Sequence, residues 1–273
     1  MKNVFAFFVL IAALLTCSAR SEAAVVKDRA YFPPVIMYHD VKLFALNGFD
    51  VTLKDFVEQI KWLQRNNYQT LSMDEFVSIV ESGKKFPSRS VLITFDDGYQ
   101  GAGLYAAREL RDRGMKATFF IIPEMIGKSI EGYPYMTEAE LKTIAESECF
   151  SIGSHTIDHP HLDQLTAEEL SRQLLESKAT LENMIGRSIN SIAYPYGDYS
   201  QEVIDGVKAA GYSVAFAVQD RGLFDREARW SIPRIYMGLI LSGDKQKLFK
   251  QYVNNYRKMP PEAFAERFAP LNQ

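Results

Sequence analysis

Cysteine is scarce in this sequence, which has only Cys17 and Cys149 among its 273 residues. If a leader that contains Cys17 is removed, the remaining chain has no internal disulfide, so its core must supply the stability. The remaining Cys149 has the chemistry of a nucleophile, but a lone cysteine is more often a structural residue of the core.

The chain also lacks an excess of charge and a basic stripe. Its formal net charge is -3, with 24% charged and 47% hydrophobic residues. This composition is that of an ordinary folded globule, and it offers no basic surface for a nucleic-acid backbone. We therefore expect no nucleic-acid partner.

The apolar run at the N-terminus is too short to span a bilayer as a helix. Lys2 precedes this run of residues 4–15, and small residues follow it before Ala24. The pattern is typical of a secretory signal peptide. We therefore expect a signal peptide over residues 1–23 and an exported mature chain, residues 24–273, in the periplasm or the medium.

Two other interpretations of this leader stay open. One is a membrane anchor, and the other is a lipid attached to Cys17 after cleavage before that residue. Thr16 is a poor residue just before a lipidated cysteine. Association with a membrane is expected only if Cys17 is lipidated.

Short apolar runs alternate with helical patterns from Val35 onward, and no linker, repeat or low-complexity segment divides the chain. Such alternation favours parallel strands that are joined by helices. The predicted strands cover residues 35–38, 91–95, 117–122, 150–153, 191–194, 213–218 and 232–236. They predict a single α/β domain, a distorted (β/α) barrel of about seven parallel strands that is closed or nearly closed.

Helix starts are marked by the Ser/Thr-x-x-Glu pattern of the capping box. The pattern occurs at Ser72 with Glu75, Thr137 with Glu140, and Thr166 with Glu169. The helix after Thr166 has an apolar stripe that Ser177 interrupts once. Gly186 marks the end of this helix, and Gly114 marks the end of an earlier one.

Histidine is rare as well, and its four positions fall in two short segments. The segment "VIMYHD" contains His39, and "GSHTIDHPHL" contains His155, His159 and His161. Each segment begins as a predicted strand and ends as a loop, as does "TFDDG" with Asp96 and Asp97. Because the carboxyl ends of all strands in a parallel barrel face the same way, we expect these residues at one mouth.

The spacing of His155 and His159 suits two imidazole ligands of one metal ion. With a carboxylate from Asp97 or Asp96 they make three protein ligands and leave a position for water, as in catalytic zinc sites. A divalent cation would offset the repulsion between the adjacent carboxylates and leave one of them free for proton transfer. Each motif alone has a simpler explanation, since "DDG" suits a turn and His pairs four apart occur on surfaces or at caps. Likewise, His39 alone suits a core histidine.

At these residues the chain resembles the polysaccharide deacetylases of carbohydrate esterase family 4, which act on chitin, peptidoglycan and exopolysaccharides. "TFDDG" resembles the first motif of the family, "SHTIDHP" the second and "AYPYG" the third. The likeness extends from about Val35 to Tyr236. It implies a metal-dependent hydrolase of linear amides on a (β/α) barrel.

The resemblance implies a role for each residue that matches a motif. Asp97, His155 and His159 would bind Zn2+, or another divalent metal such as Co2+ or Ni2+. Asp96 would be the general base that takes a proton from the metal-activated water. The backbone N–H of Tyr196 would help to hold the developing oxyanion.

The general acid is the first departure from the family pattern. Most members have a histidine in a fifth motif near the C-terminus, but no histidine follows His161 here. "VIMYHD" resembles that motif moved to the front, as in the circularly permuted branch that deacetylates poly-β-1,6-N-acetylglucosamine. The resemblance then makes His39 the general acid, because the first and last strands of a closed barrel are neighbours.

The third motif is the second departure. It usually begins with an Arg that orients the base, and this sequence has Ala193 there. Arg234, in "WSIPRIYM", is the candidate replacement, and a surface or structural ion pair is the alternative. Trp230 either lines the sugar site or packs in the core.

We therefore expect a metal-dependent N-deacetylase that acts on an N-acetylated polysaccharide outside the cytoplasm. An O-acetyl esterase would use the same metal and base, and a glycan-binding protein with a degenerate site is a third alternative. The permuted motif favours β-1,6-linked N-acetylglucosamine, while peptidoglycan and chitin stay open as substrates.

Overall fold

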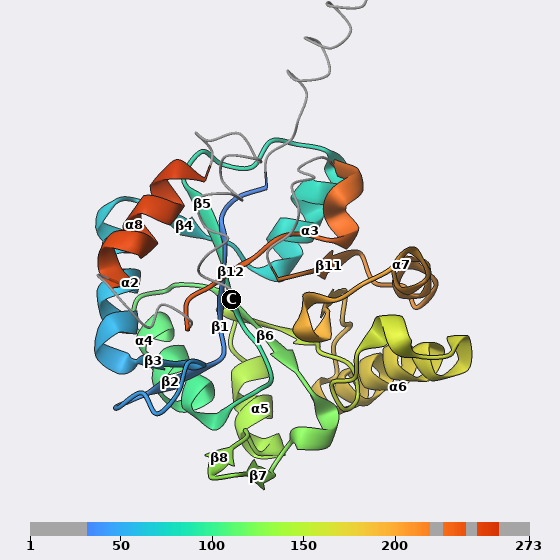
Figure 1. Ribbon diagram of the computed structural model, residues 1–273. Coiled ribbons are helices and arrows are strands. Elements are labelled where there is room, and N and C mark those ends of the chain that lie inside the picture. The colour runs from blue at the N-terminus through green and yellow to red at the C-terminus, as the bar shows by residue number, and fades with distance from the viewer. Residues whose placement is uncertain (1–31, 219–225, 239–244, 257–273) are drawn as a thin grey trace, which may run out of the picture.

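The computed structural model describes residues 32–218, 226–238 and 245–256, and Figure 1 shows a curled sheet with helices around it. The predicted signal peptide, including Cys17, lies outside the described residues. Within the described ranges, no helix has the length and apolar character needed to cross a bilayer.

The main sheet consists of parallel strands in the order β11-β10-β9-β6-β5-β1-β12. Their bounds are Val35–Tyr38 for β1, Ser90–Phe95 for β5, Ala117–Ile121 for β6, Phe150–Ser154 for β9, Ser191–Ala193 for β10, Val214–Phe216 for β11 and Ile235–Tyr236 for β12. All the strands predicted from the sequence are present, although those predicted over 213–218 and 232–236 are shorter, at three and two residues. The predicted α/β barrel is confirmed as well.

Residues 232–236 join the two sides of the sheet through two separate pairings. β12 pairs with β1, whereas Ile232 forms a parallel bridge with Phe216 at the end of β11. Between these pairings lies Pro233, which has no backbone N–H to donate to a ladder. The strand predicted over 232–236 is therefore shorter than expected. The single bridge between Ile232 and Phe216, here called the narrow seam, closes the ring of strands.

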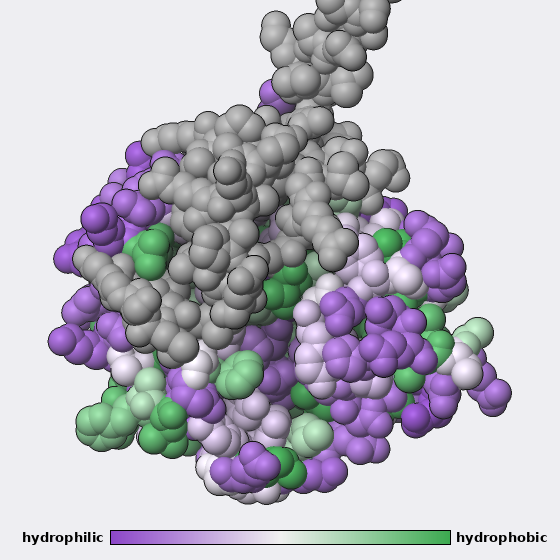
Figure 2. All heavy atoms as spheres, in the orientation of Figure 1, coloured by the Kyte–Doolittle hydropathy of each residue, from purple (hydrophilic) through white to green (hydrophobic). Residues whose placement is uncertain are grey.

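Several short strands were not predicted, because two or three residues are too few to show a period of two. They are β2 (Asp40–Lys42), β3 (Asp50–Thr52), β4 (Gln69–Thr70), β7 (Ser129–Ile130) and β8 (Tyr133–Pro134). β4 pairs with the start of β5, while β2 pairs with β3 and β7 with β8. Exposed Leu43, Phe44 and Leu46 lie between β2 and β3, where Figure 2 shows apolar surface at the lower left.

Helices cover the outside of the sheet, as Figure 1 shows. They are α2 (Leu53–Arg65), α3 (Met73–Ser82), α4 (Ala107–Arg111), α5 (Glu138–Ala145), α6 (Ala167–Ile185), α7 (Gln201–Ala209) and α8 (Lys245–Asn255). The three predicted capping boxes are confirmed at the starts of α3, α5 and α6. Gly186 ends α6 with φ 68°, and Gly114, with φ 62°, follows the end of α4.

Alternation along the strands decides which residues face the barrel interior. One apolar cluster takes a residue from each of five strands: Val35, Leu92, Phe120, Ala193 and Phe216. Their chain neighbours, such as Ile36 and Ile93, belong to a second cluster that includes the surrounding helices. Because the period of a strand is two, His39 and Asp96 fall on the interior face with Val35 and Leu92.

Candidate metal centre and active site

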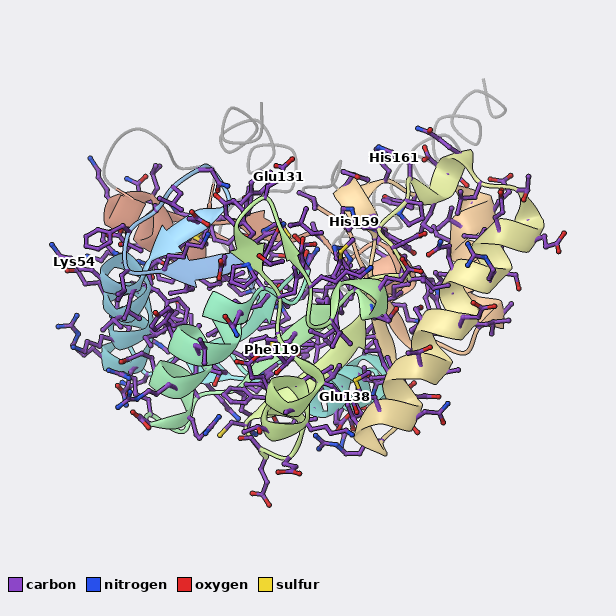
Figure 3. The ribbon with its side chains drawn as sticks, turned by 90° about the horizontal axis from the view of Figure 1, so that it is seen from below. Lys54, Phe119, Glu131, Glu138, His159 and His161 are labelled. Atoms are coloured by element: carbon purple, nitrogen blue, oxygen red, sulfur yellow. The ribbon has the colours of Figure 1, made fainter. Side chains whose placement is uncertain are left out.

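The site residues named from the sequence lie at one end of the barrel. His39, Asp96 and His155 directly follow β1, β5 and β9. In Figure 3, His159 and His161 lie toward the upper edge of the molecule, whereas Glu138, at the start of α5, lies near the lower edge. The parallel strand ends thus bring the separate sequence segments to one mouth.

A tight turn after β5 places the two adjacent carboxylates. Asp96 N–H still donates to the carbonyl of Tyr38, at 2.9 Å, so Asp96 continues the ladder between β1 and β5. Asp97 then has a left-handed backbone with φ 69°, and Gly98 follows with φ 85°. A Cβ at Gly98 would lie 3.1 Å from Ile121, in a conformation that favours glycine. The chain therefore turns directly after β5, and both carboxylates stay at the open end of the barrel.

Asp97 lies between two imidazole rings. Its Oδ1 is 3.4 Å from Nε2 of His155 and 3.7 Å from Nε2 of His159. One ligand atom from each of these three residues lies within 4.8 Å of the others. Both rings therefore direct a nitrogen at the same carboxylate oxygen, at a spacing that a single ion can bridge.

The hydrogen bonds of Asp97 and His155 suit a bound cation. His155 Nδ1 lies 2.8 Å from the carbonyl oxygen of Ala193, which can only accept. In the neutral ring the proton is therefore on Nδ1, and Nε2 presents its lone pair to Asp97. Among the described residues, Oδ1 of Asp97 is buried without a hydrogen-bond partner. Two imidazole nitrogens and one carboxylate oxygen are a ligand set of catalytic zinc, so the residues fit a divalent cation.

The pKa values in this group are strongly coupled. Burial alone would lower the pKa of His155, but the contact with Asp97 and the charge of Asp96 raise it above its ordinary value. Burial and the charge of His155 lower the pKa of His159 to about 4. Burial would raise the pKa of Asp97, yet the close contact with His155 and the charges of the nearby imidazoles lower it. A cation must displace the proton of His155, because both use the lone pair on Nε2.

Arg234 forms a two-pronged ion pair with Asp96. Its terminal nitrogens donate to the two carboxylate oxygens, both at 2.6 Å, and its Nε donates to the Ala217 carbonyl at 3.1 Å. Arg234 is only 1% exposed, and its guanidinium lies over the ring of Phe120. Burial would raise the pKa of Asp96, but the charge of Arg234 outweighs it and lowers the pKa. Of the alternative, a surface or structural ion pair, the surface position is therefore wrong, whereas an ion pair is present: Arg234 binds both oxygens of Asp96 inside the barrel.

His39 faces Asp97 across the mouth, with its Nε2 4.0 Å from Oδ2 of that carboxylate. The rings of Phe49 and Tyr236 flank it, with centroids 5.6 and 4.8 Å away. Its Nδ1 is buried and has no hydrogen-bond partner in the part of the chain that the structure describes. Burial lowers the pKa of His39, although the charge of Asp97 opposes this. His39 is thus not a core histidine with its hydrogen bonds satisfied.

Tyr196 lies at the rim, in the short turn Pro195–Gly197 after β10, with a left-handed φ of 58°. Its exposed ring stacks on His161, with centroids 3.9 Å apart, and meets His159 edge-on at 4.5 Å. His161 itself contacts Asp198, with 3.1 Å between Nδ1 and Oδ2. Ring contacts therefore pack the third motif against the loop that carries both histidines.

One cavity of about 500 Å³ joins these residues. It is lined by six of the side chains named from the sequence: His39, Asp96, Asp97, His155, His159 and Tyr196. Sequence reasoning missed several of its other walls, which include Tyr99, Tyr135 and Tyr236. Tyr99 directly follows "DDG", and its position next to this motif is the sequence feature that could have predicted it as a wall of the cavity. Tyr135 stacks on it, with centroids 4.7 Å apart, but directly follows β8 of the unpredicted hairpin β7–β8.

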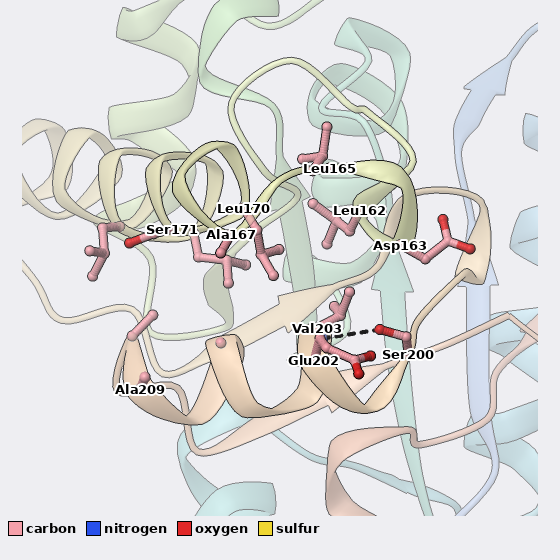
Figure 4. Close-up of a pocket in the computed structure, with 14 residues that line it drawn as sticks. Leu162, Asp163, Leu165, Ala167, Leu170, Ser171, Ser200, Glu202, Val203 and Ala209 are labelled. Atoms are coloured by element: carbon pink, nitrogen blue, oxygen red, sulfur yellow. Dashed lines mark hydrogen bonds between the residues drawn. The ribbon is translucent and has the colours of Figure 1, made fainter.

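Two residues that were considered for function lie outside this cavity. Trp230 packs against the main core, with Arg229 over its ring at 4.6 Å, and Cys149 is a half-buried residue at the edge of the same core. Both are packing residues. A second cavity, of about 460 Å³, lies between α6 and α7 and is lined by residues such as Leu170 and Val203. Figure 4 shows it, and none of the expected site residues lines it.

Comparison with known sequences gives consistent matches. Residues 83–215 match the family described as polysaccharide deacetylase. The Bacillus subtilis (strain 168) protein YxkH, named as a polysaccharide deacetylase, is 34% identical over 210 residues, 77% of this chain and 73% of that protein. The poly-beta-1,6-N-acetyl-D-glucosamine N-deacetylase of Staphylococcus aureus (strain MRSA252) is 28% identical over 199 residues, 70% of this chain and 68% of that protein.

Solved structures have the same fold. IcaB from Ammonifex degensii superposes with a TM-score of 0.70 at 18% identity, over 82% of this chain and 98% of that chain. Streptococcus pyogenes deacetylase PplD, in complex with acetate, superposes with a TM-score of 0.68 at 21% identity, over 75% of this chain and 91% of that chain. At these identities the likeness establishes a shared fold.

Proposed function

The chain belongs to the polysaccharide deacetylase family, whose members are hydrolases of amide bonds, and on this premise we propose its reaction. It removes N-acetyl groups from N-acetylglucosamine units of an extracytoplasmic polysaccharide, with a divalent metal ion at its centre. The observation that carries the proposal is Asp97 between the Nε2 atoms of His155 and His159, beside the ion pair of Asp96 and Arg234. This arrangement combines a set of metal ligands with a separate carboxylate that is free to move a proton.

Asp97, His155 and His159 hold the ion in this proposal, and zinc, cobalt and nickel are the metals that we expect to support activity. When bound, the ion supplies a Lewis acid that polarises an acetamide carbonyl and makes water more acidic. The bond from His155 Nδ1 to the Ala193 carbonyl fixes the ring so that Nε2 faces the ion.

Asp96 is the proposed general base. Its pKa is held below the ordinary value by Arg234, so the carboxylate is ionised and ready to accept a proton from the attacking water. Arg234 occupies one lone pair on each oxygen, which leaves a second lone pair for the proton. The fixed geometry keeps Asp96 turned toward the cavity.

His39 is the proposed general acid, and it gives the proton on Nε2 to the leaving amine. Burial lowers the pKa of His39, whereas the charges of Asp97 and Asp96 favour the protonated ring that this role requires. The backbone N–H of Tyr196 helps to hold the oxyanion that forms on the acetamide carbonyl. His39 and Tyr196 line the same cavity as Asp96, which supports a shared role at one acetamide group.

The proposed substrate is poly-β-1,6-N-acetylglucosamine. The name of the Staphylococcus aureus relative and the position of His39 before the other motifs support this choice. The tyrosines around the cavity offer flat aromatic faces for sugar rings. We also propose that residues 1–23 are a signal peptide and that residues 24–273 act in the periplasm or the medium, where such a polymer occurs.

Acetate release from a panel of acetylated compounds tests the proposal. The zinc-loaded chain without residues 1–23 is given β-1,6- and β-1,4-linked N-acetylglucosamine tetramers and a small O-acetyl ester. We expect the highest kcat/KM on the β-1,6 tetramer, and a rise with oligomer length because neighbouring sugars add binding energy.

Each other outcome has a distinct meaning. A clear preference for the β-1,4 tetramer would overturn the choice of polymer but keep the N-deacetylase assignment. Turnover of the ester alone would identify an O-acetyl esterase. Bound zinc without turnover of any compound would identify a glycan-binding protein with a degenerate site.

A further inference from the structure

The loop that carries both proposed histidine ligands, residues 155–159, has a strained backbone. Thr156 and His159 have left-handed φ values of 65° and 67°, although neither is glycine. Such a conformation is unfavourable for a residue other than glycine and persists only where the surroundings hold it. Pro160 follows directly and disfavours a helical conformation at His159. Contacts from outside the loop must therefore keep the two imidazoles together.

Two of these contacts come from one side chain on the core face of α6. Gln173 is 3% exposed, and its Oε1 accepts a hydrogen bond from Ile157 N–H at 2.8 Å. Its Nε2 donates to Oδ1 of Asp158 at 2.6 Å. Gln173 thus binds two successive residues midway between His155 and His159.

Hydroxyl groups extend this support along the loop. Ser154 Oγ accepts a hydrogen bond from Thr156 N–H at 3.2 Å and lies 2.9 Å from Oγ of Ser177. Thr156 Oγ1 in turn accepts from His159 N–H at 3.1 Å. Ser177 is the residue that interrupts the apolar stripe of α6, so two polar side chains on this core face serve the same loop.

We propose that Gln173 is a positioning residue for the metal centre, which holds the loop so that His155 and His159 meet Asp97 at one ion. This inference rests on the proposed metal site. A buried amide is unfavourable unless its polar atoms are paired, and those of Gln173 pair with this loop. An apolar residue would serve the packing of α6 without that requirement.

Gln173→Met tests the proposal, because methionine keeps the length of the side chain but bonds neither Ile157 nor Asp158. Zinc is titrated into the metal-free protein against a competing chelator, and we expect its affinity to fall by roughly 10–100-fold. Gln59→Met is the matched control, since Gln59 is 1% exposed on α2 and accepts a hydrogen bond from the Tyr38 hydroxyl. The control should lose thermal stability with no change in zinc affinity.

Amide hydrogen exchange of the metal-free proteins gives a second readout that needs neither metal nor substrate. Gln173→Met should speed exchange at Ile157 and His159, and Gln59→Met should not. Unchanged exchange or zinc affinity in Gln173→Met, or an equal loss of affinity in both variants, would overturn the positioning role alone. Failure of the wild-type protein to bind zinc would overturn the proposed metal centre and this role together.

Discussion

Replacing Arg234 with methionine should leave Asp96 as a buried charge without its partner. Arg234 donates to both oxygens of Asp96 at 2.6 Å, and the two side chains are 0% and 2% exposed. Removing one partner from a buried pair of this kind lowers the free energy of unfolding by about 3–5 kcal/mol. We expect a loss of this size in Arg234→Met at neutral pH.

This loss should become smaller as the pH falls. In the wild-type protein Arg234 holds the pKa of Asp96 below its unfolded value, so the pair stabilises the fold at neutral pH. That contribution is lost as the pH falls through the lowered folded-state pKa. In Arg234→Met the effect of burial dominates and raises the pKa of Asp96. Protonation then removes the buried charge from the variant at a pH where the wild-type protein keeps its ion pair.

Urea unfolding of the metal-free proteins at pH 7 and pH 5 measures this difference. Arg234→Lys is the control, because lysine keeps the positive charge but cannot bind both oxygens in one plane, and it should lose less. A loss below about 1 kcal/mol, the size expected for an exposed ion pair, would refute the reasoning. A loss of several kcal/mol that does not change with pH would refute the claim that Asp96 takes up a proton in Arg234→Met.

Further predictions concern the metal ion and the proton transfers. Chelation should abolish acetate release, and added zinc, cobalt or nickel should restore it; full activity in a preparation that elemental analysis shows to be metal-free would refute metal dependence. His155→Ala should lose bound zinc in the same titration, because two protein ligands seldom hold zinc tightly, and unchanged affinity would remove His155 from the ligand set. Asp96→Asn and His39→Ala should keep zinc but lower kcat by roughly 10²–10⁴-fold, so a fully active His39→Ala would exclude it as the acid. Zinc affinity should weaken as the pH falls through the raised pKa of His155, since the proton and the ion compete for Nε2; an affinity independent of pH would contradict this competition.

The sequence predicted the main strands because strands covered on both faces consist of nearly continuous apolar residues. Ser90–Phe95, for example, is buried along its whole length. The short pairs β2–β3 and β7–β8 carry no such signal, because their pairing depends on contacts between loops. The narrow seam at Ile232 was also beyond prediction, since it depends on how far the whole sheet curls.

The candidate site was predictable where its chemistry is local in the sequence. Asp96, Asp97, His155 and His159 stand in two compact motifs at strand ends, and the structure brings them together. Arg234 remained undecided in the sequence because 138 residues separate it from Asp96. Gln173 gave no signal, since its position on an amphipathic helix does not reveal what its amide binds.

The narrow seam at Ile232 bears on the order in which a new chain acquires the parts of the site. The proposed metal ligands and base lie between residues 96 and 159, whereas Arg234 belongs to the segment that joins β11 to β1 near the end of the barrel. A ribosome therefore completes the ligand set, which ends at His159, 75 residues before it adds Arg234, the residue that holds Asp96 in place. A chain that ends before Ile232 lacks both the bridge to β11 and this ion pair, so one short segment both closes the ring and supplies the partner of Asp96.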